Sequence, residues 1–130
     1  MKVIYILIGQ VVLLVGVVIL GLMLKGDLLE GPRILHRIAG SLAGIVGLIG
    51  AVMLLRQPVG LAQKVLACLA VTFIFIAGLA GSSLKIASNY LLTFNLMEIS
   101  GSLALISSIA LLVLVLRSKP ATKTLDETVL

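Results

Sequence analysis

The sequence contains few of the residues on which most catalytic and metal sites are built. Its 130 residues include one histidine, one cysteine and no tryptophan, and only 12% are charged. One histidine and one cysteine cannot form a Cys/His zinc cluster, and no Ser/His/Asp set, P-loop or dinucleotide-binding fingerprint is present. The sequence therefore excludes hydrolytic and metalloprotease chemistry and shows no nucleotide-binding motif.

A single cysteine also limits the covalent structure. Cys68 lies within a long apolar segment, and with no second cysteine the chain cannot form an intramolecular disulfide. We expect Cys68 to act as a small packing residue.

Polar residues are too scarce to cover the surface of a small soluble domain. Hydrophobic residues make up 61% of the chain, which predicts an integral membrane protein. A bilayer core of ~30 Å needs about 20 apolar residues in a helix. Four runs without charge approach or exceed that length, at residues 3–24, 38–55, 65–84 and 99–116.

The predicted fold is therefore all-α, an integral membrane four-helix transmembrane bundle with up-down-up-down topology. We expect a transmembrane domain over residues 1–117 and a flexible polar tail over residues 118–130. The expected spans are about 3–25, 34–56, 61–83 and 93–117. The first is longer than the apolar part of a secretion signal and has no small-residue cleavage site before Lys25, so we interpret it as a permanent span.

The net charge of +5 comes from basic residues scattered over the helix ends. This pattern indicates contact with the lipid bilayer rather than with nucleic acid. With the amino terminus cytoplasmic, six lysines and arginines lie inside and four outside, which predicts that both termini are cytoplasmic in a prokaryotic cell membrane. The inner set is Lys2, Arg56, Lys64, Arg117, Lys119 and Lys123, and the outer set is Lys25, Arg33, Arg37 and Lys85.

His36 begins a stripe of small residues on the second predicted helix. Gly40, Gly44, Gly47 and Ala51 follow it at helical spacing. Close packing against another helix is the usual explanation for such a stripe. The alternative is that the glycines below the histidine leave space for a flat macrocycle whose iron His36 binds.

The fourth predicted helix has a similar face, formed by Met97, Gly101, Ala104 and Ser108. Counting one membrane thickness back from Arg117 places Met97 at the depth of His36. Its thioether is a candidate second ligand to haem iron. Filling space in the apolar interior is the alternative role for this methionine.

Polar residues inside the predicted spans require partners. Glu98 is the only acid within a span, and we expect its carboxylate to pair with His36 or Arg37, or to serve as a proton site. Asn95 and Ser102 lie near it on the same helix. Gln10 and Thr72 are expected to form hydrogen bonds between helices.

The order of these elements resembles one four-helix half of the haem A synthase family. The similarity covers roughly residues 30 to 117 and is carried by His36-Arg37-Ile-Ala-Gly40, a short basic turn, a third helix ending Ala77-Gly78-Leu-Ala-Gly81, and Ser88-Asn89 before the fourth helix. In that family the second and fourth helices each begin with a histidine at the outer surface. The resemblance therefore implies that His36 ligates haem.

Other family features are not matched. Where the family has its second histidine, the best register places Leu96, so the adjacent Met97 would replace that ligand or haem would be pentacoordinate. The loop before His36 has no cysteine pair, and Glu30 does not match the position of the catalytic glutamate. We therefore do not carry over the haem-oxidising activity.

These observations lead to three hypotheses. The first is a small haem A synthase-like membrane protein that binds haem near the outer face through His36 and acts in respiratory electron transfer or haem handling, as a homo-oligomer or with other membrane subunits. The second is a cofactor-free structural subunit of a larger membrane complex. The third is a small proton-coupled transport component that uses Glu98.

Overall fold

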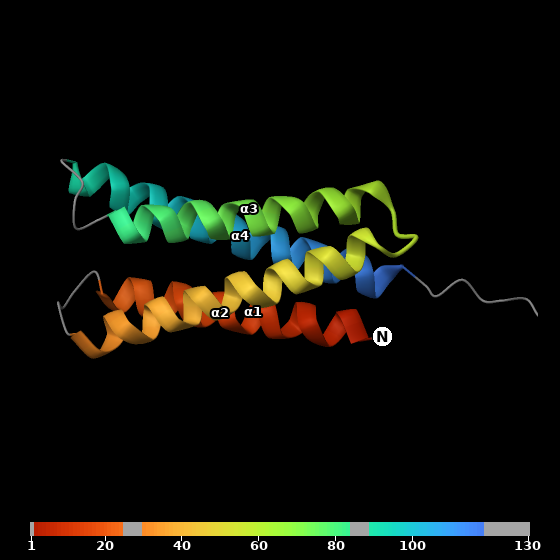
Figure 1. Cartoon of the computed structure of the whole chain (residues 1–130), viewed down its shortest axis with the longest axis horizontal. Coiled ribbons are helices and arrows are strands. Elements are labelled where there is room, and N and C mark those ends of the chain that lie inside the picture. The colour runs from red at the N-terminus through yellow and green to blue at the C-terminus, as the bar shows by residue number, and fades with distance from the viewer. Residues whose placement is uncertain (1, 25–29, 84–88, 119–130) are drawn as a thin grey trace, which may run out of the picture.

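The structure, a computed structural model, describes residues 2–24, 30–83 and 89–118. These residues form four helices, α1 (Lys2–Leu24), α2 (Glu30–Leu55), α3 (Leu61–Ser83) and α4 (Tyr90–Arg117), and no strand occurs among them (Figure 1). The predicted all-α four-helix bundle is confirmed. The predicted tail lies outside the described residues from residue 119 onward, as do Lys25, Lys85 and Ser88.

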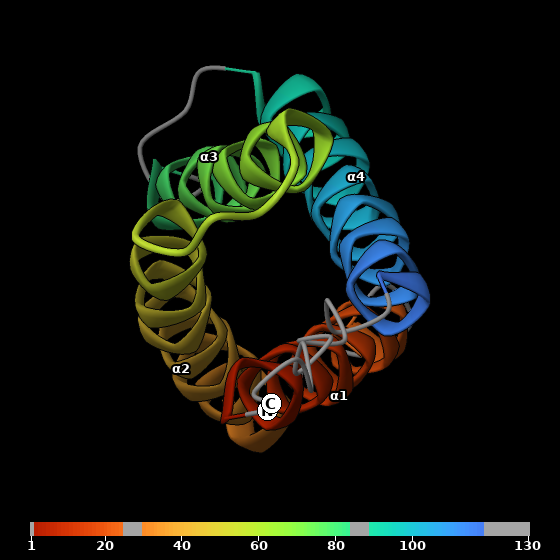
Figure 2. The ribbon, with the colours of Figure 1, turned by 90° about the vertical axis from the view of Figure 1, so that its right-hand side faces the viewer.

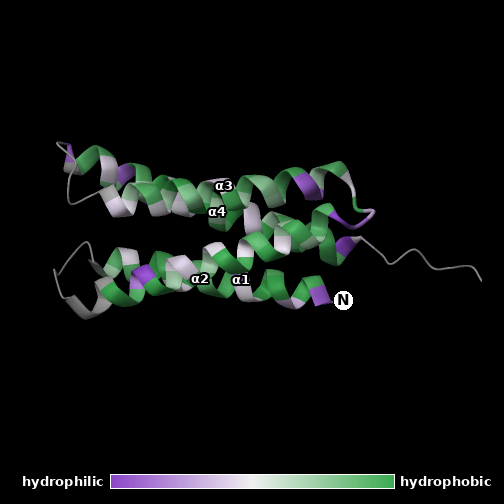
Figure 3. Cartoon of the chain, viewed as in Figure 1, coloured by the Kyte–Doolittle hydropathy of each residue, from purple (hydrophilic) through white to green (hydrophobic). Residues whose placement is uncertain are grey.

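Each helix is long and apolar enough to cross a membrane. Only 22% to 28% of the most apolar stretch of each helix is buried inside the protein. Most apolar side chains therefore face outward, as expected for helices in contact with lipid. Figure 3 shows apolar residues along the helices and hydrophilic residues gathered toward their ends. The chain is an integral membrane protein by these criteria.

The four helices form two hairpins. α1 packs most extensively against α2, and α3 packs most extensively against α4. Seen end-on, α1 lies diagonally opposite α3, and α2 lies diagonally opposite α4 (Figure 2). The hairpins lie close together at the end that holds Arg56 and diverge toward the end that holds His36 (Figure 1). We call these the Arg56 end and the His36 end.

Most buried apolar residues lie between the Arg56 end and the middle of the bundle. One cluster, near the Arg56 end, is formed by Val3, Leu7, Ala51, Leu54, Ala67 and Leu111. A second, in the middle, is formed by Leu14, Ala43, Ile74 and Ala104. Beyond the second cluster, toward the His36 end, the buried positions among the described residues are Ala80 and Ser100. Tight packing thus holds the hairpins together mainly away from His36.

The two hairpins are an internal repeat. Ten residues of α2 recur in α4 sixty-one positions later, from Leu35 (Leu96) to Arg56 (Arg117). The α2 residues are Leu35, Ile38, Gly40, Ser41, Leu42, Ala43, Ile45, Val52, Leu55 and Arg56. The repeated elements run in the same direction and lie diagonally opposite, so a pseudo-two-fold axis along the bundle relates the two hairpins.

The repeat is also seen in the positions of α1 and α3 that are buried. Positions 3, 7, 10 and 14 of α1 are buried, and so are positions 63, 67, 70 and 74 of α3, sixty residues later. None of these four pairs of residues is identical, so α1 and α3 repeat the positions that are buried and not the residue types. The buried positions in each helix are three or four residues apart, as expected for a helix that packs through one face.

Two glutamines connect the helices. The Gln10 amide in α1 donates a hydrogen bond to Ser108 Oγ in α4 over 3.1 Å, which confirms the expectation for Gln10. Gln63, at the start of α3, accepts a hydrogen bond from the backbone N–H of Gly60 and donates to Leu114 O in α4. Gln63 thereby ties the α2–α3 turn to the end of α4.

Two expectations for α3 are wrong. Thr72 donates its hydrogen bond to Cys68 O in its own helix, over 2.8 Å, because a threonine hydroxyl in a helix readily reaches the carbonyl four residues earlier. Cys68 is exposed on the outer side of α3. It therefore does not act as an interior packing residue.

Candidate functional site

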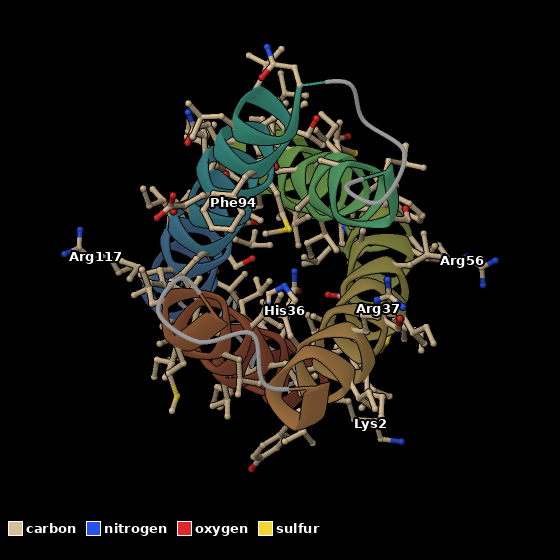
Figure 4. All side chains as sticks on the ribbon, turned by 90° about the vertical axis from the view of Figure 1, so that its left-hand side faces the viewer. Lys2, His36, Arg37, Arg56, Phe94 and Arg117 are labelled. Atoms are coloured by element: carbon tan, nitrogen blue, oxygen red, sulfur yellow. The ribbon has the colours of Figure 1, made fainter. Side chains whose placement is uncertain are left out.

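His36 lies on the inner side of α2 and its ring points toward the space between the helices (Figure 4). Its Nδ1 lies 3.0 Å from Val17 O in α1. A carbonyl oxygen only accepts hydrogen bonds, so Nδ1 carries the proton and donates it. In the neutral ring the lone pair is then on Nε2. A backbone carbonyl holds the rings of many metal-binding histidines in this way.

Gly21 of α1 makes this contact possible. A methyl group at Gly21 would lie 3.4 Å from His36 Cε1 and 3.8 Å from Nδ1. A larger side chain would occupy the space in which the ring lies. The absence of a side chain at Gly21 thus lets the imidazole approach the backbone of α1 closely enough to reach Val17 O.

Met97 of α4 occupies the position that corresponds to His36 in the repeat. A methyl group at Gly81 of α3 would lie 3.2 Å from Met97 Sδ. Gly81 is itself the counterpart of Gly21, sixty residues later. Each hairpin therefore places one candidate iron ligand against a glycine of its other helix, His36 against Gly21 and Met97 against Gly81.

Open space lies one helical turn below both candidate ligands. Gly40 follows His36 by four residues and Gly101 follows Met97 by four, and a methyl group added at either glycine would meet no atom within 4 Å. Further along α2 the interior is filled, since a methyl group at Gly47 would lie 3.0 Å from Gln10 Nε2. The small residues below His36 therefore differ in their surroundings. Gly47 allows close packing between helices, whereas the space beside Gly40 is open.

The structure does not pair Glu98 with His36, whose hydrogen bond goes to Val17 O. Glu98 borders an open depression on the outer side of α4 together with Asn95, Ile99, Ser102 and Leu103. The inner side of α4 at this level carries Ser100 and Ala104, which are buried. A helical position one residue after Met97 is turned by about 100° from it, which carries Glu98 away from the interior.

Arg37 is the counterpart of Glu98 in the repeat and follows His36 as Glu98 follows Met97. Its side chain is exposed on α2 (Figure 4). α2 and α4 are diagonal helices that make no close backbone contact. The expected pairing of Glu98 with Arg37 is therefore not found within the described structure either.

Comparison with protein-family models, with curated proteins and with solved structures found no match. The similarity to the haem A synthase family therefore rests on the residues quoted above. Within the internal repeat, the residue equivalent to His36 is Met97.

No group of three or more His, Cys, Asp or Glu side chains that could hold a metal ion occurs among the residues that the structure describes. What the His36 end offers is one imidazole nitrogen and one thioether sulfur, on opposite hairpins and at equivalent heights. Imidazole and thioether groups are side-chain types that can ligate haem iron.

The prediction from sequence did not include Gly21 or Gly81. Gly21 lies in a long apolar run without distinctive neighbours, and Gly81 was quoted only as part of the family resemblance. The repeat relates them, since Gly81 follows Gly21 by sixty residues, the offset that also relates the buried positions of α1 and α3. The offset of sixty-one that relates α2 to α4 pairs His36 with Met97.

Proposed function

We propose that the protein binds haem between its two hairpins at the His36 end, with His36 Nε2 and Met97 Sδ as the iron ligands. Its role would be electron transfer in a respiratory chain or the handling of haem. The observation that carries the proposal is the hydrogen bond from His36 Nδ1 to Val17 O, because it leaves Nε2 as the nitrogen that can bind iron.

The space around these ligands supports the same conclusion. Gly40 and Gly101 have no atom within reach of an added methyl group, and the two apolar clusters lie away from the His36 end. A flat, largely apolar macrocycle suits a site between two hairpins that each contribute one ligand and one glycine below it.

When bound, haem would supply a one-electron couple, and a methionine ligand opposite histidine raises its potential relative to two histidines. The protein's own residues would orient and enclose the group. Gly21 lets the imidazole reach Val17 O, and this bond holds the ring in one orientation. Met97 packs against Gly81, which limits the positions available to the sulfur.

Haem titration of the purified protein in mild detergent tests this function. We expect a Soret band with the sharp visible bands of a six-coordinate haem, and loss or a large shift of these bands in His36→Ala. Ser41→Ala, on the exposed side of the same helix, is the matched control and should bind as the wild type does. Wild-type protein that is folded by circular dichroism yet takes up no haem would refute the proposal and favour a structural subunit.

We further propose that both termini are cytoplasmic, which places the His36 end at the outer face of a prokaryotic cell membrane. Gln57, in the exposed α2–α3 turn at the Arg56 end, offers a test. In a Cys68→Ser background, Gln57→Cys should react with a membrane-impermeant thiol reagent only after the cells are opened. Labelling of intact cells would reverse the orientation.

A further inference from the structure

The charges of the described helices are unevenly divided between the two ends of the bundle. At the Arg56 end, each helix contributes one basic residue at or within about one turn of its terminus. They are Lys2 of α1, Arg56 directly after α2, Lys64 of α3 and Arg117 of α4. Both acids of the described residues, Glu30 and Glu98, lie toward the His36 end. Among the described residues the Arg56 end therefore carries four positive charges and no negative one.

These four basic side chains have no partner within the described part of the chain. None of them forms an ion pair or a side-chain hydrogen bond there. Lys2, Arg56 and Arg117 are exposed, and Lys64 is half-buried. The three exposed side chains extend away from the bundle (Figure 4). Their charges must therefore be solvated by what surrounds the protein at this end.

The cations are distributed as one arginine and one lysine for each hairpin. Arg56 and Arg117 are equivalent in the repeat and extend to opposite sides of the bundle (Figure 4). Lys2 begins α1, which packs against α2, and Lys64 lies near the start of α3, which packs against α4. The Arg56 end thus has two basic surfaces, Arg56 with Lys2 and Arg117 with Lys64.

The membrane determines what lies beside these surfaces. The helices are long enough to cross the bilayer, so residues at their termini lie in the layer of lipid head groups. Tyr5 follows Lys2 by three residues on the same side of α1 and is 73% exposed. Tyrosine favours this layer, because its ring contacts acyl chains while its hydroxyl reaches the head groups. The anionic group available at this depth is the phosphate of a phospholipid.

We propose that the Arg56 end binds anionic phospholipids, one at each basic surface, through the lipid phosphate. The arginine guanidinium can hold two phosphate oxygens through parallel hydrogen bonds, and the lysine ammonium adds a second positive charge. Four positive charges without carboxylates favour a lipid with a net negative charge, such as phosphatidylglycerol. Phosphatidylcholine binds more weakly, because its own quaternary ammonium group neutralises its phosphate.

Lipid titration of the full chain in mild detergent tests this proposal. Phosphatidylglycerol and phosphatidylcholine are compared without added haem, and native mass spectrometry counts the lipids bound. We expect two phosphatidylglycerol molecules per chain, bound about tenfold or more tightly than phosphatidylcholine, and weaker binding at high salt. Haem is proposed at the opposite end of the bundle, so a failure of haem binding would leave this result unaffected.

Neutral substitutions identify the side chains that hold the lipids. Arg56→Gln should weaken the binding of one of the two phosphatidylglycerol molecules about fivefold, and Arg56→Gln/Arg117→Gln should weaken both. Arg37→Gln removes the same charge from an exposed position near the His36 end and should leave lipid binding unchanged. Far-UV circular dichroism checks that each variant is helical.

Several results would overturn the proposal. They are equal affinity for the two lipids, wild-type affinity in the double variant, and an equal loss in Arg37→Gln, which would indicate attraction by total charge alone. A wild type that prefers neither lipid but retains an acidic protein until high salt releases it would assign the basic surfaces to a protein partner instead. Should the double variant not fold, Arg56→Gln and Arg117→Gln measure the same contacts singly, and unchanged affinity in both would also refute the proposal.

Discussion

His36 on α2 and Met97 on α4 occupy equivalent positions in two repeated hairpins, sixty-one residues apart. Each lies against a glycine of the preceding helix, Gly21 for His36 and Gly81 for Met97. The repeat thus places an imidazole and a thioether at equivalent positions of one end of the bundle. The first predictions concern this pair.

Replacing Met97 by histidine should lower the midpoint potential of bound haem without preventing haem binding. Met97→His gives both hairpins an imidazole at the equivalent position, and we expect a six-coordinate haem whose midpoint potential is lower by on the order of 100 mV, because a thioether stabilises the reduced iron. Redox titration followed by visible spectroscopy measures the shift.

Met97→Leu should instead leave the iron with His36 alone and give the spectrum of a five-coordinate haem. Met53→Leu, a similar change at a half-buried position near the Arg56 end, serves as the control and should leave the spectrum unaltered. A spectrum that is the same in wild type and Met97→Leu would remove Met97 as a ligand.

Filling the space at Gly40 should block haem while leaving the fold intact. A methyl group there meets no atom within 4 Å, so Gly40→Leu can be accommodated in the folded protein but its side chain would occupy the region below His36. We expect haem affinity to fall about tenfold or more, as judged by Soret titration. Gly78→Leu, at an exposed glycine of α3 with equally open surroundings, should bind normally, and equal loss in both variants would argue against a site at Gly40.

A branched side chain at Gly21 should displace the imidazole. Gly21→Val places two methyl groups near His36 Cε1, where even one carbon lies at 3.4 Å, and the bond to Val17 O is then lost. Loss of such a supporting bond typically lowers metal affinity by about ten- to a hundredfold. A methyl group added at Gly16 would meet no atom within 4 Å, so Gly16→Val is the control for the effect of a β-branched residue in α1. Normal haem affinity in Gly21→Val would show that the bond does not orient the ligand.

Removing the Ser108 hydroxyl should destabilise the bundle. Ser108→Ala leaves the buried Gln10 amide without the hydroxyl that accepts its hydrogen bond, and hydrogen bonds between membrane helices are worth about 0.6 to 1.7 kcal/mol. Thr72→Val removes a hydroxyl that bonds only within its own helix and should change stability by less. Denaturation in mixed detergent micelles compares the two. A larger loss in Thr72→Val would contradict the assignment.

Alanine substitutions at Gly47 and Gly9 test how closely the helices pack. Gly47→Ala places a carbon 3.0 Å from Gln10 Nε2 and 3.3 Å from Ile74 Cδ1, so we expect a loss of about 1 to 3 kcal/mol. Gly9→Ala has nothing within 4 Å and gains helix propensity, so it should be neutral or stabilising. If both variants have the same stability, the interior at Gly47 is looser than these distances indicate.

The helices themselves could be predicted from sequence because length and apolarity are local properties. The membrane imposes a minimum run of apolar residues, and any segment that meets it must be helical to satisfy its backbone. The inner face of α4 was also predictable, since Met97, Gly101, Ala104 and Ser108 recur at helical spacing. The hydrogen-bond partner of Thr72 could not be predicted, because a hydroxyl in a helix can bond to the backbone of its own helix as easily as to a neighbouring helix.

The sequence by itself determined a four-helix membrane protein with His36 at the end of α2 and a polar Gln10 in α1. Only the tertiary structure decided which side chains meet. It gave His36 the carbonyl of Val17, turned Glu98 to the outer side of α4, and placed Met97 against Gly81 of α3. The physical reason is that the position of a side chain around a helix is local, whereas its partner depends on which hairpin packs beside it and on whether a glycine, such as Gly21, allows the approach.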